Sequence, residues 1–256
     1  MSARGSLLLV PNTLDFGVPG EPARLDELLP LGVIRVASRL QHWVCENART
    51  TRAFLKRVDA VCPLERPLQE LSIVELPRSR KDVEAAAEGL DVGALLAPAL
   101  AGHDLGLLSE AGLPALADPG AGLVAAAHAA GVPVVALPGA SAIALALAAS
   151  GMNGQSFAFV GYVPVAADAR AARIRGLEAA SRRDEQTQVL IETPYRNAAL
   201  LDALLLHLQP TTALSVSICL SLANGHTRSA KVSDWRRQPM TIAADLPAVF
   251  AFLARR

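Results

Sequence analysis

Two short stretches rich in glycine, serine and proline carry the residue types best suited to chemistry. Ser109–Pro114 reads SEAGLP, and Pro138–Ala142 reads PGASA. Small residues let a ligand approach the main chain, and the free N–H groups at a helix start favour a carboxylate or phosphate. Both stretches therefore indicate a site for a small polar ligand. Ser141 alone fits a helix N-cap equally well.

The elements around these stretches would place them at one edge of a sheet. Each follows a short apolar run, Leu105–Leu108 or Val132–Leu137, and each precedes a helical pattern. A strand that turns into a helix at glycine or proline is how α/β proteins build ligand sites at the carboxyl ends of their strands. The two stretches are thus predicted to be strand-to-helix turns.

Strand-like and helical segments alternate along the chain, which predicts an α/β fold with a parallel, doubly wound sheet. In residues 1–137 the predicted strands are Leu7–Val10, Val33–Ala37, Leu105–Leu108 and Val132–Leu137, and the predicted helices are 48–58, 81–100 and 121–130. A second α/β domain is predicted over 138–256. Its predicted strands are Phe157–Tyr162, Gln188–Glu192, Leu214–Leu220 and Leu246–Leu253, with helices at 142–150, 168–180 and 197–208.

Composition and charge describe a folded, electrically balanced chain. Of 256 residues, 52% are hydrophobic and 19% charged, and 24 Lys and Arg balance 24 Asp and Glu. A nucleic-acid partner would therefore need a local basic patch. The segment from residue 48 onward offers one candidate, formed by Arg49, Arg52, Lys56 and Arg57, although a solvated helix face explains the same charges.

The cysteines and the apolar runs favour a cytoplasmic protein with no membrane segment. Cys45, Cys62 and Cys219 have no CxxC spacing and no clustered histidines, so neither a zinc site nor a disulfide framework is indicated. No run approaches the roughly 18 apolar residues of a membrane span. The chain also lacks GxGxxG after its first strand and GxxxxGK[ST] anywhere, which argues against ordinary dinucleotide and nucleoside triphosphate sites.

Five motifs in a fixed order resemble one known superfamily. They are CENARTT, SEAGLPALADPG, AGVPVVALPGASA, GYVP and IETPYRN. Together they resemble the S-adenosylmethionine-dependent tetrapyrrole methylase superfamily, most of all its branch of ribosomal RNA small-subunit methyltransferase I, which 2′-O-methylates a cytidine. The match extends over roughly residues 7–205.

The resemblance implies two α/β domains, with S-adenosylmethionine held in a cleft between them, and a homodimer. It implies cofactor-binding roles for Ser109, Glu110, Ala111, Gly112, Leu113, Pro114, Gly139, Ala140, Ser141, Ala142, Glu192, Thr193, Pro247 and Ala248. The implied substrate-binding residues are Glu46, Arg49, Tyr195 and Arg196. For Pro247 and Ala248 a plain buried strand is an equally good interpretation, and for Glu46 and Arg49 so is an ion pair that opens a helix.

Departures from the family pattern leave the catalytic residues unassigned. Asn47 stands where the branch has aspartate, and an amide cannot accept a proton as a carboxylate can. The glycine of the first loop is displaced in Pro11–Gly17, which leaves the role of that loop in binding open. Leu220–Ala223 lacks the charged pair of the RNA-modifying branch.

Three interpretations of the function therefore remain. In the first the protein methylates the ribose of ribosomal RNA, and in the second it methylates a tetrapyrrole or another small molecule. In the third it is a relative that binds the cofactor without catalysis. Methyl transfer from a sulfonium needs alignment and a dry site rather than a protein nucleophile, because the cofactor carries the activated group.

Overall fold

The computed structural model describes residues 4–15, 17–20, 22–77 and 92–255, and the chain divides into two compact units. The first comprises Met1–Phe16 and Pro22–Ala140, and the second comprises Gly17–Glu21 and Ser141–Arg256. Each unit contains one five-stranded sheet. The prediction of two α/β domains is confirmed.

The first unit is built on a parallel sheet in the order β3-β2-β4-β1-β5. Its strands are β1 (Leu7–Leu9), β2 (His42–Cys45), β3 (Ser72–Glu75), β4 (Leu105–Leu108) and β5 (Val134–Ala136). All four strand pairs are parallel. Since parallel sheets need both faces covered, the all-apolar strand β4 at the centre is buried throughout.

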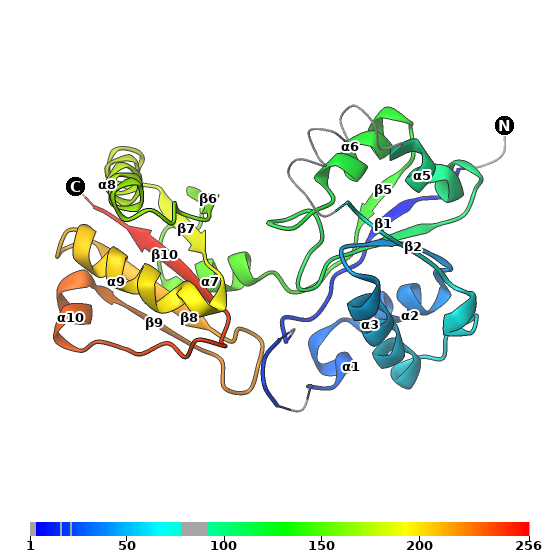
Figure 1. Cartoon of the computed structure of the whole chain (residues 1–256), viewed down its shortest axis with the longest axis horizontal. Helices are drawn as coiled ribbons and strands as arrows, with labels where there is room; N and C mark the ends of the chain where they lie inside the picture. The colour runs from blue at the N-terminus through cyan, green and yellow to red at the C-terminus, as the bar shows by residue number, and fades with distance from the viewer. Residues whose placement is uncertain (1–3, 16, 21, 78–91, 256) are drawn as a thin grey trace. The chain divides into compact units, whose positions relative to one another are not determined.

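Helices cover both faces of this sheet, as Figure 1 shows for α2 and α3 on one side and α5 and α6 on the other. The helices are α1 (Leu25–Leu28), α2 (Leu31–Arg39), α3 (Ala48–Val61), α5 (Val92–Leu100) and α6 (Ala121–Ala129), with a 3₁₀ turn at Leu68–Glu70. Two separate cores result, because side chains alternate across each strand. Leu8 and Trp43 belong to the core under α2 and α3, whereas Leu7 and Val44 belong to the core under α5 and α6.

The prediction of a strand at Val33–Ala37 is wrong, because these residues form the middle of α2. The buried residues are Val33, Ile34, Ala37 and Ser38, a spacing of three to four that defines one helix face. The short β-branched run resembles a strand only when it is considered without its flanks. The second strand of the sheet is β2 instead, a four-residue segment that the sequence pattern did not indicate.

The second unit is built on a mixed sheet in the order β6-β7-β10-β8-β9, in which only β6 and β7 are parallel. Its strands are β6 (Phe157–Gly161), β7 (Thr187–Ile191), β8 (Ala213–Ile218), β9 (His226–Lys231) and β10 (Ala248–Leu253). Its helices are α7 (Ala142–Ser150), α8 (Ala167–Asp184), α9 (Asn197–His207) and α10 (Val232–Arg237), with a 3₁₀ turn at Pro194–Arg196. Helix α7 packs on one face of the sheet, and the other three helices share the core on the opposite face.

The remaining predicted elements occur with boundaries shifted by a few residues. The predicted helix 81–100 falls partly outside the described residues, and its described part is α5. Strand β9 was missed because its sequence, HTRSAK, has no apolar run at the sheet edge. None of the helices in the described ranges is long and apolar enough to cross a membrane.

Gly106 lets the indole of Trp43 pack directly against strand β4. A Cβ at this position would lie 2.7 Å from Trp43 Cε3 and 3.1 Å from Leu40 Cδ1. We expect Gly106→Ala to lower the free energy of unfolding by about 1–3 kcal/mol, because this core has no room to yield. Urea unfolding measures the effect. The control is Gly122→Ala in helix α6, where the added methyl meets nothing within 4 Å, and alanine there should stabilise the protein by up to about 1 kcal/mol. Equal stabilities of the two variants would contradict this account.

Candidate functional site

The loops that follow the strands of the first sheet gather at its carboxyl edge. Val10, just after β1, donates to Leu107 O at 2.9 Å, and Asn12 N donates to Gly112 O at 2.8 Å. The loop after β1 therefore lies against the SEAGLP stretch, Ser109–Pro114, which follows β4. This is the edge at which open α/β sheets bind ligands.

Asn12 holds this arrangement through its side-chain amide. Its Nδ2 donates to Ser109 O at 3.0 Å and to Glu110 O at 3.1 Å, while its Oδ1 accepts from Thr13 N at 2.8 Å. The side chain is buried, with 6% of the residue exposed. No local sequence pattern predicts this role of Asn12, since its partners lie almost 100 residues away.

Two glycines allow the close approach of these loops. Gly112 adopts a φ of +67°, which favours glycine. A Cβ on Gly139 would lie 2.2 Å from Pro11 Cβ, so the loop after β5 contacts the loop after β1 directly. The first loop is thus packed between the two stretches that the sequence singled out. Its residue 16 lies outside the described ranges.

Glu46 and Asn47 link helix α3 to the same edge. Glu46 Oε2 accepts from Glu110 N at 3.1 Å. Asn47 caps α3, because its Oδ1 accepts from Arg49 N at 2.9 Å and from Thr50 N at 3.4 Å. The helix is therefore opened by an amide cap. Among the described residues no ion pair joins Glu46 to Arg49.

Asp118, from the ADPG part of the second motif, is held in an environment that favours its protonated form. Burial raises the pKa of its carboxyl to about 7, and the carboxylates of Glu46 and Glu110 act in the same direction. A hydrogen bond with the Ser109 side chain acts the other way. The edge thus contains a carboxyl group that titrates near neutrality beside two others. No local sequence pattern predicts this raised pKa, because it is caused by burial and by carboxylates from other segments of the chain.

A pocket of about 290 Å³ opens beside these carboxylates. It is lined by Glu46, Asn47, Leu76, Pro77, Glu110 and Pro119. It brings together two predicted site residues, Glu46 and Glu110, from different loops. Its position at the carboxyl ends of β2 and β4 fits ligand binding in an open α/β sheet.

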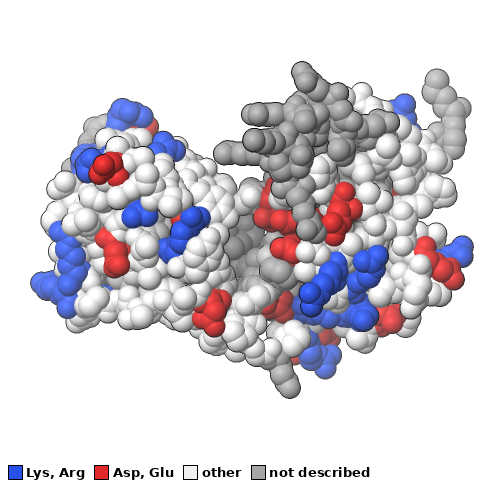
Figure 2. Space-filling view, in the orientation of Figure 1, with Lys and Arg blue, Asp and Glu red and all other residues white. Residues whose placement is uncertain are grey.

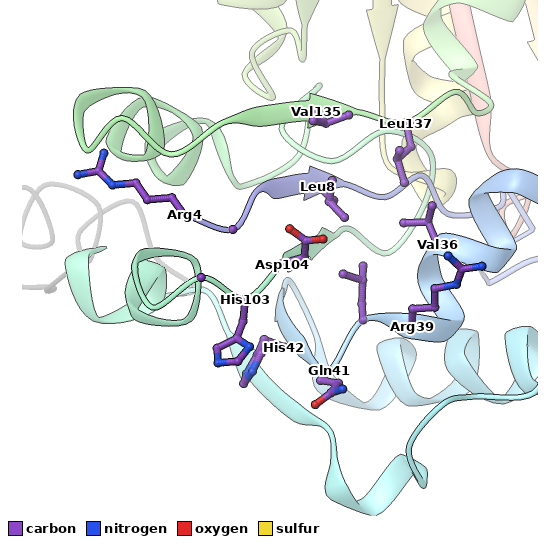
Figure 3. Close-up of a pocket in the computed structure, with 13 residues that line it drawn as sticks. Arg4, Leu8, Val36, Arg39, Gln41, His42, His103, Asp104, Val135 and Leu137 are labelled. Carbon is purple, nitrogen blue, oxygen red and sulfur yellow. The ribbon is translucent and has the colours of Figure 1, made fainter. Parts of the chain in front are cut away.

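A larger hollow of about 610 Å³ lies at the opposite, amino edge of the first sheet. Figure 3 shows the His42 and His103 rings side by side among its lining residues, with Leu8 and Val135 from the sheet, Leu137 just after β5 and Val36 from α2. The ring centroids are 5.4 Å apart, and burial together with His103 lowers the pKa of His42. None of the predicted site residues lines this hollow.

In the second unit, Glu192 organises the segment after β7. Its Oε1 accepts from Thr193 N at 2.7 Å and from Arg196 Nη2 at 2.9 Å. The Glu192 side chain is only 6% exposed, so this ion pair is largely buried. Arg196 also lies over the ring of Tyr195, which is 69% exposed. Glu192, predicted to bind the cofactor, and Arg196, predicted to bind the substrate, thus form an ion pair with each other.

The other predicted residues of the second unit lie close to this segment. Ile191 pairs with Val249, which places Glu192 opposite Ala248 at the start of β10. Ser141 caps α7, since its Oγ accepts from Ala144 N at 3.4 Å, and Ala142 and Ile191 both pack against the core that α7 shares with β7 and β10. The capping interpretation of Ser141 is confirmed, whereas a ligand role for its hydroxyl stays a prediction.

Beside them, Asn197 carries a buried oxygen that lacks a partner. Its Nδ2 donates to Leu246 O at 2.9 Å, next to Pro247, while its Oδ1 accepts no hydrogen bond within the described chain. The residue is fully buried. An unpaired buried acceptor is rare and calls for a donor from elsewhere.

Comparison with known proteins agrees with this architecture. The sequence model for "Tetrapyrrole (Corrin/Porphyrin) Methylases" matches residues 24–233. Ribosomal RNA small subunit methyltransferase I from Micromonospora olivasterospora is 43% identical over 197 residues, which cover 77% of this chain and 54% of the relative. Its namesake from Pseudomonas aeruginosa is 36% identical over 95 residues, which cover 37% of this chain and 32% of the relative. The chain thus spans about half the length, or less, of the curated relatives that it matches.

Solved structures show the same fold over nearly the whole chain. Uroporphyrin-III-C-methyltransferase from Thermus thermophilus aligns with a TM-score of 0.52 at 21% identity and covers 98% of this chain and 94% of its own. The methyltransferase CobJ aligns with a TM-score of 0.55 at 17% identity, covering 96% and 93%. A further structure of the Thermus enzyme, described as complexed with S-adenyl homocysteine, aligns with a TM-score of 0.51 at 19% identity, covering 97% of each chain. Because the family match extends over most of the sequence, the chain belongs to the tetrapyrrole (corrin/porphyrin) methylase family.

Proposed function

We propose that this protein binds S-adenosylmethionine and transfers its methyl group to a ribose hydroxyl of ribosomal RNA. The observation that carries the proposal is the meeting of three loops at the carboxyl edge of the first sheet, where Asn12 ties the SEAGLP stretch to the loop after β1. In a chain of this family, loops that are ordered at this edge support a cofactor site.

The residues present suit such a cofactor. Gly112 has a left-handed conformation and no side chain, so a ligand can approach the main chain at this position. In the second unit, Asn197 Oδ1 is an acceptor without a donor beside Leu246 and Pro247. An amino group of an adenine ring is the kind of donor that this oxygen lacks.

The proposed cofactor residues fall into one group in each unit. In the first unit they are Ser109–Pro114, Gly139 and Ala140, and in the second they are Ser141, Ala142, Glu192, Thr193, Pro247 and Ala248. The proposed substrate residues are Glu46 and Arg49 in the first unit and Tyr195 and Arg196 in the second.

The protein's own contribution is binding, orientation and the exclusion of water. The bound cofactor supplies an activated methyl group on a sulfonium, so no protein nucleophile is required. The loops would hold the donor, while the buried Glu192–Arg196 pair keeps its segment rigid. No proton acceptor is assigned.

The choice of RNA as acceptor rests on the relatives at 43% and 36% identity, both described as ribosomal RNA methyltransferases. The tetrapyrrole methyltransferases among the solved structures are at most 21% identical, so they support the fold rather than a substrate. Cytoplasmic location is part of the proposal, and the three free cysteines are in keeping with a reducing compartment. A homodimer is proposed on the family resemblance, and domains at 1–137 and 138–256 are proposed on the change in the pattern of strands and helices after residue 137.

Isothermal titration with S-adenosylmethionine and S-adenosylhomocysteine tests the cofactor directly. We expect both to bind with a dissociation constant below about 100 μM, a binding free energy stronger than roughly −5 kcal/mol. Failure of both ligands to bind well above that concentration would reject the cofactor assignment. Transfer of a labelled methyl group is then compared between small-subunit ribosomal RNA and a tetrapyrrole. Label on the tetrapyrrole alone would reject RNA as the acceptor, and cofactor binding without any transfer would identify a non-catalytic relative.

A further inference from the structure

Helix α3 carries an unusual distribution of charge. Four of its residues are basic, namely Arg49, Arg52, Lys56 and Arg57, whereas Asp59 is its one acidic residue. Asp59 Oδ1 accepts from Leu64 N at 2.9 Å, which occupies it at the end of the helix. The helix therefore offers positive charge without a matching acidic row.

The structure separates one of these basic residues from the other three. Arg57 turns inward, where its Nη2 lies 2.9 Å from Asp15 Oδ2 and 2.9 Å from Ala23 O. Arg57 therefore anchors the loop after β1. It does not belong to the surface patch of four basic residues that the sequence offered as a candidate. Arg49, Arg52 and Lys56 are exposed at a spacing of three and four, so they share one face of α3. These three residues are called the α3 strip below.

The charges of the α3 strip are unpaired within the described residues. None of the three forms an ion pair there, and the only side-chain hydrogen bond among them joins Arg52 Nη1 to Ala48 O at 3.3 Å. Figure 2 shows Lys and Arg side chains gathered in one patch over the α3 region. Helix α8 also exposes Arg173 and Arg175, with Asp168 in its first turn, whereas its Glu178 is buried and accepts hydrogen bonds from the segment after α9.

The charges at the two ends of α3, Arg49 and Asp59, work against the stability of the helix. Arg49 lies in the first turn, which contains no acidic residue, and Asp59 lies near the last turn, which contains no basic residue. The helix dipole favours the opposite arrangement. Helix stability therefore gives no reason for a basic residue in the first turn, and the exposed charges of the strip are free to meet an anionic partner.

We infer that the α3 strip binds the phosphate backbone of the RNA substrate. The strip spans about 10 Å along the helix axis, and each of its three cations can contact a phosphate of the RNA. Asn47 lines the pocket together with Glu46 and also caps α3, so the strip starts two residues beyond the pocket, at the proposed substrate residue Arg49. This inference rests on the proposed function, since it names how the same RNA is held.

The test is the salt dependence of binding to transcribed small-subunit ribosomal RNA. Arg52→Gln/Lys56→Gln removes two charges and retains good helix formers. We expect the slope of log affinity against log salt to fall by about 1.4, and affinity near 0.1 M salt to fall by about 10- to 30-fold. The charge-retaining swap Arg52→Lys/Lys56→Arg should keep the wild-type slope. Titration with S-adenosylmethionine and thermal unfolding should be unchanged in both variants.

A control variant in another helix tests whether the change in salt dependence is specific to α3. Arg173→Gln/Arg175→Gln removes two exposed charges from α8 and should alter the slope much less. A slope for Arg52→Gln/Lys56→Gln equal to that of the wild type, in a wild-type protein that binds and methylates RNA, overturns the inference alone. A wild-type protein that binds the cofactor but shows no salt-dependent binding to RNA overturns both the inference and RNA as the acceptor.

Discussion

Replacement of Asp118 with asparagine will remove most of a steep decline in stability between about pH 4 and pH 7. Burial raises the pKa of this carboxyl to about 7, with help from Glu46 and Glu110, whereas an unfolded aspartate titrates near 3.9. Between these values the folded state binds more protons than the unfolded state, so the free energy of unfolding falls as pH rises. The decline contributed by Asp118 is about 3–4 kcal/mol.

Urea unfolding of the wild type and Asp118→Asn at pH 5, 6, 7 and 8 measures this difference. We expect the two proteins to be closest in stability at pH 5 and the variant to be more stable at pH 8, because asparagine carries no charge to bury. Asp202→Asn, at an exposed position of α9, serves as the control and should follow the wild type. Parallel curves for the wild type and Asp118→Asn would show that the carboxyl is ionised without cost in the fold.

Local sequence patterns were sufficient to predict the positions of the loops that follow apolar strands. The SEAGLP and PGASA stretches lie after β4 and β5, and their glycines make the close contacts that small residues allow. These features depend on residues adjacent in sequence, where turn chemistry dominates. The same holds for Ser141, whose side chain caps the helix that it precedes.

Elements without a strong local pattern were missed or misassigned. Val33–Ala37 has strand-forming residues, yet tertiary packing on the sheet selects the helix with its buried spacing of three to four. Strands β3 and β9 are edge strands with mostly exposed or half-buried residues, so no alternation marked them.

The chemistry of the site depends on contacts between distant segments. The raised pKa of Asp118 arises first from its own burial and then from the carboxylate of Glu46, some seventy residues earlier. Likewise the inward turn of Arg57 depends on Asp15, and so the basic patch predicted from sequence has three members rather than four. Sequence reasoning named the residue types at this edge but not their partners.

Because Asn12 joins two of the loops at this edge, its amide should matter for both stability and cofactor binding. Asn12→Asp keeps the shape of the side chain and the acceptor for Thr13 N, but replaces the donor to Ser109 O and Glu110 O with an oxygen. At pH 8 the ionised carboxylate would be buried against two carbonyl oxygens. We expect the free energy of unfolding to fall by about 3 kcal/mol or more, and the affinity for S-adenosylmethionine to fall at least about tenfold (about 1.4 kcal/mol).

The loss should depend on pH, which separates the charge from a change of shape. The surroundings raise the pKa of the introduced carboxyl, so the neutral acid forms as pH falls and donates again to one carbonyl. The difference from the wild type should therefore shrink from pH 8 to pH 5. Asn153→Asp is the control, because the Nδ2 of Asn153 also donates to a main-chain carbonyl, Glu185 O, and its Oδ1 also accepts from a main-chain N–H, that of Gln155, but in a half-buried position. That variant should lose less than about 1 kcal/mol. If Asn12→Asp matched Asn153→Asp in stability and bound the cofactor as the wild type does, the loop after β1 would have no part in organising the site.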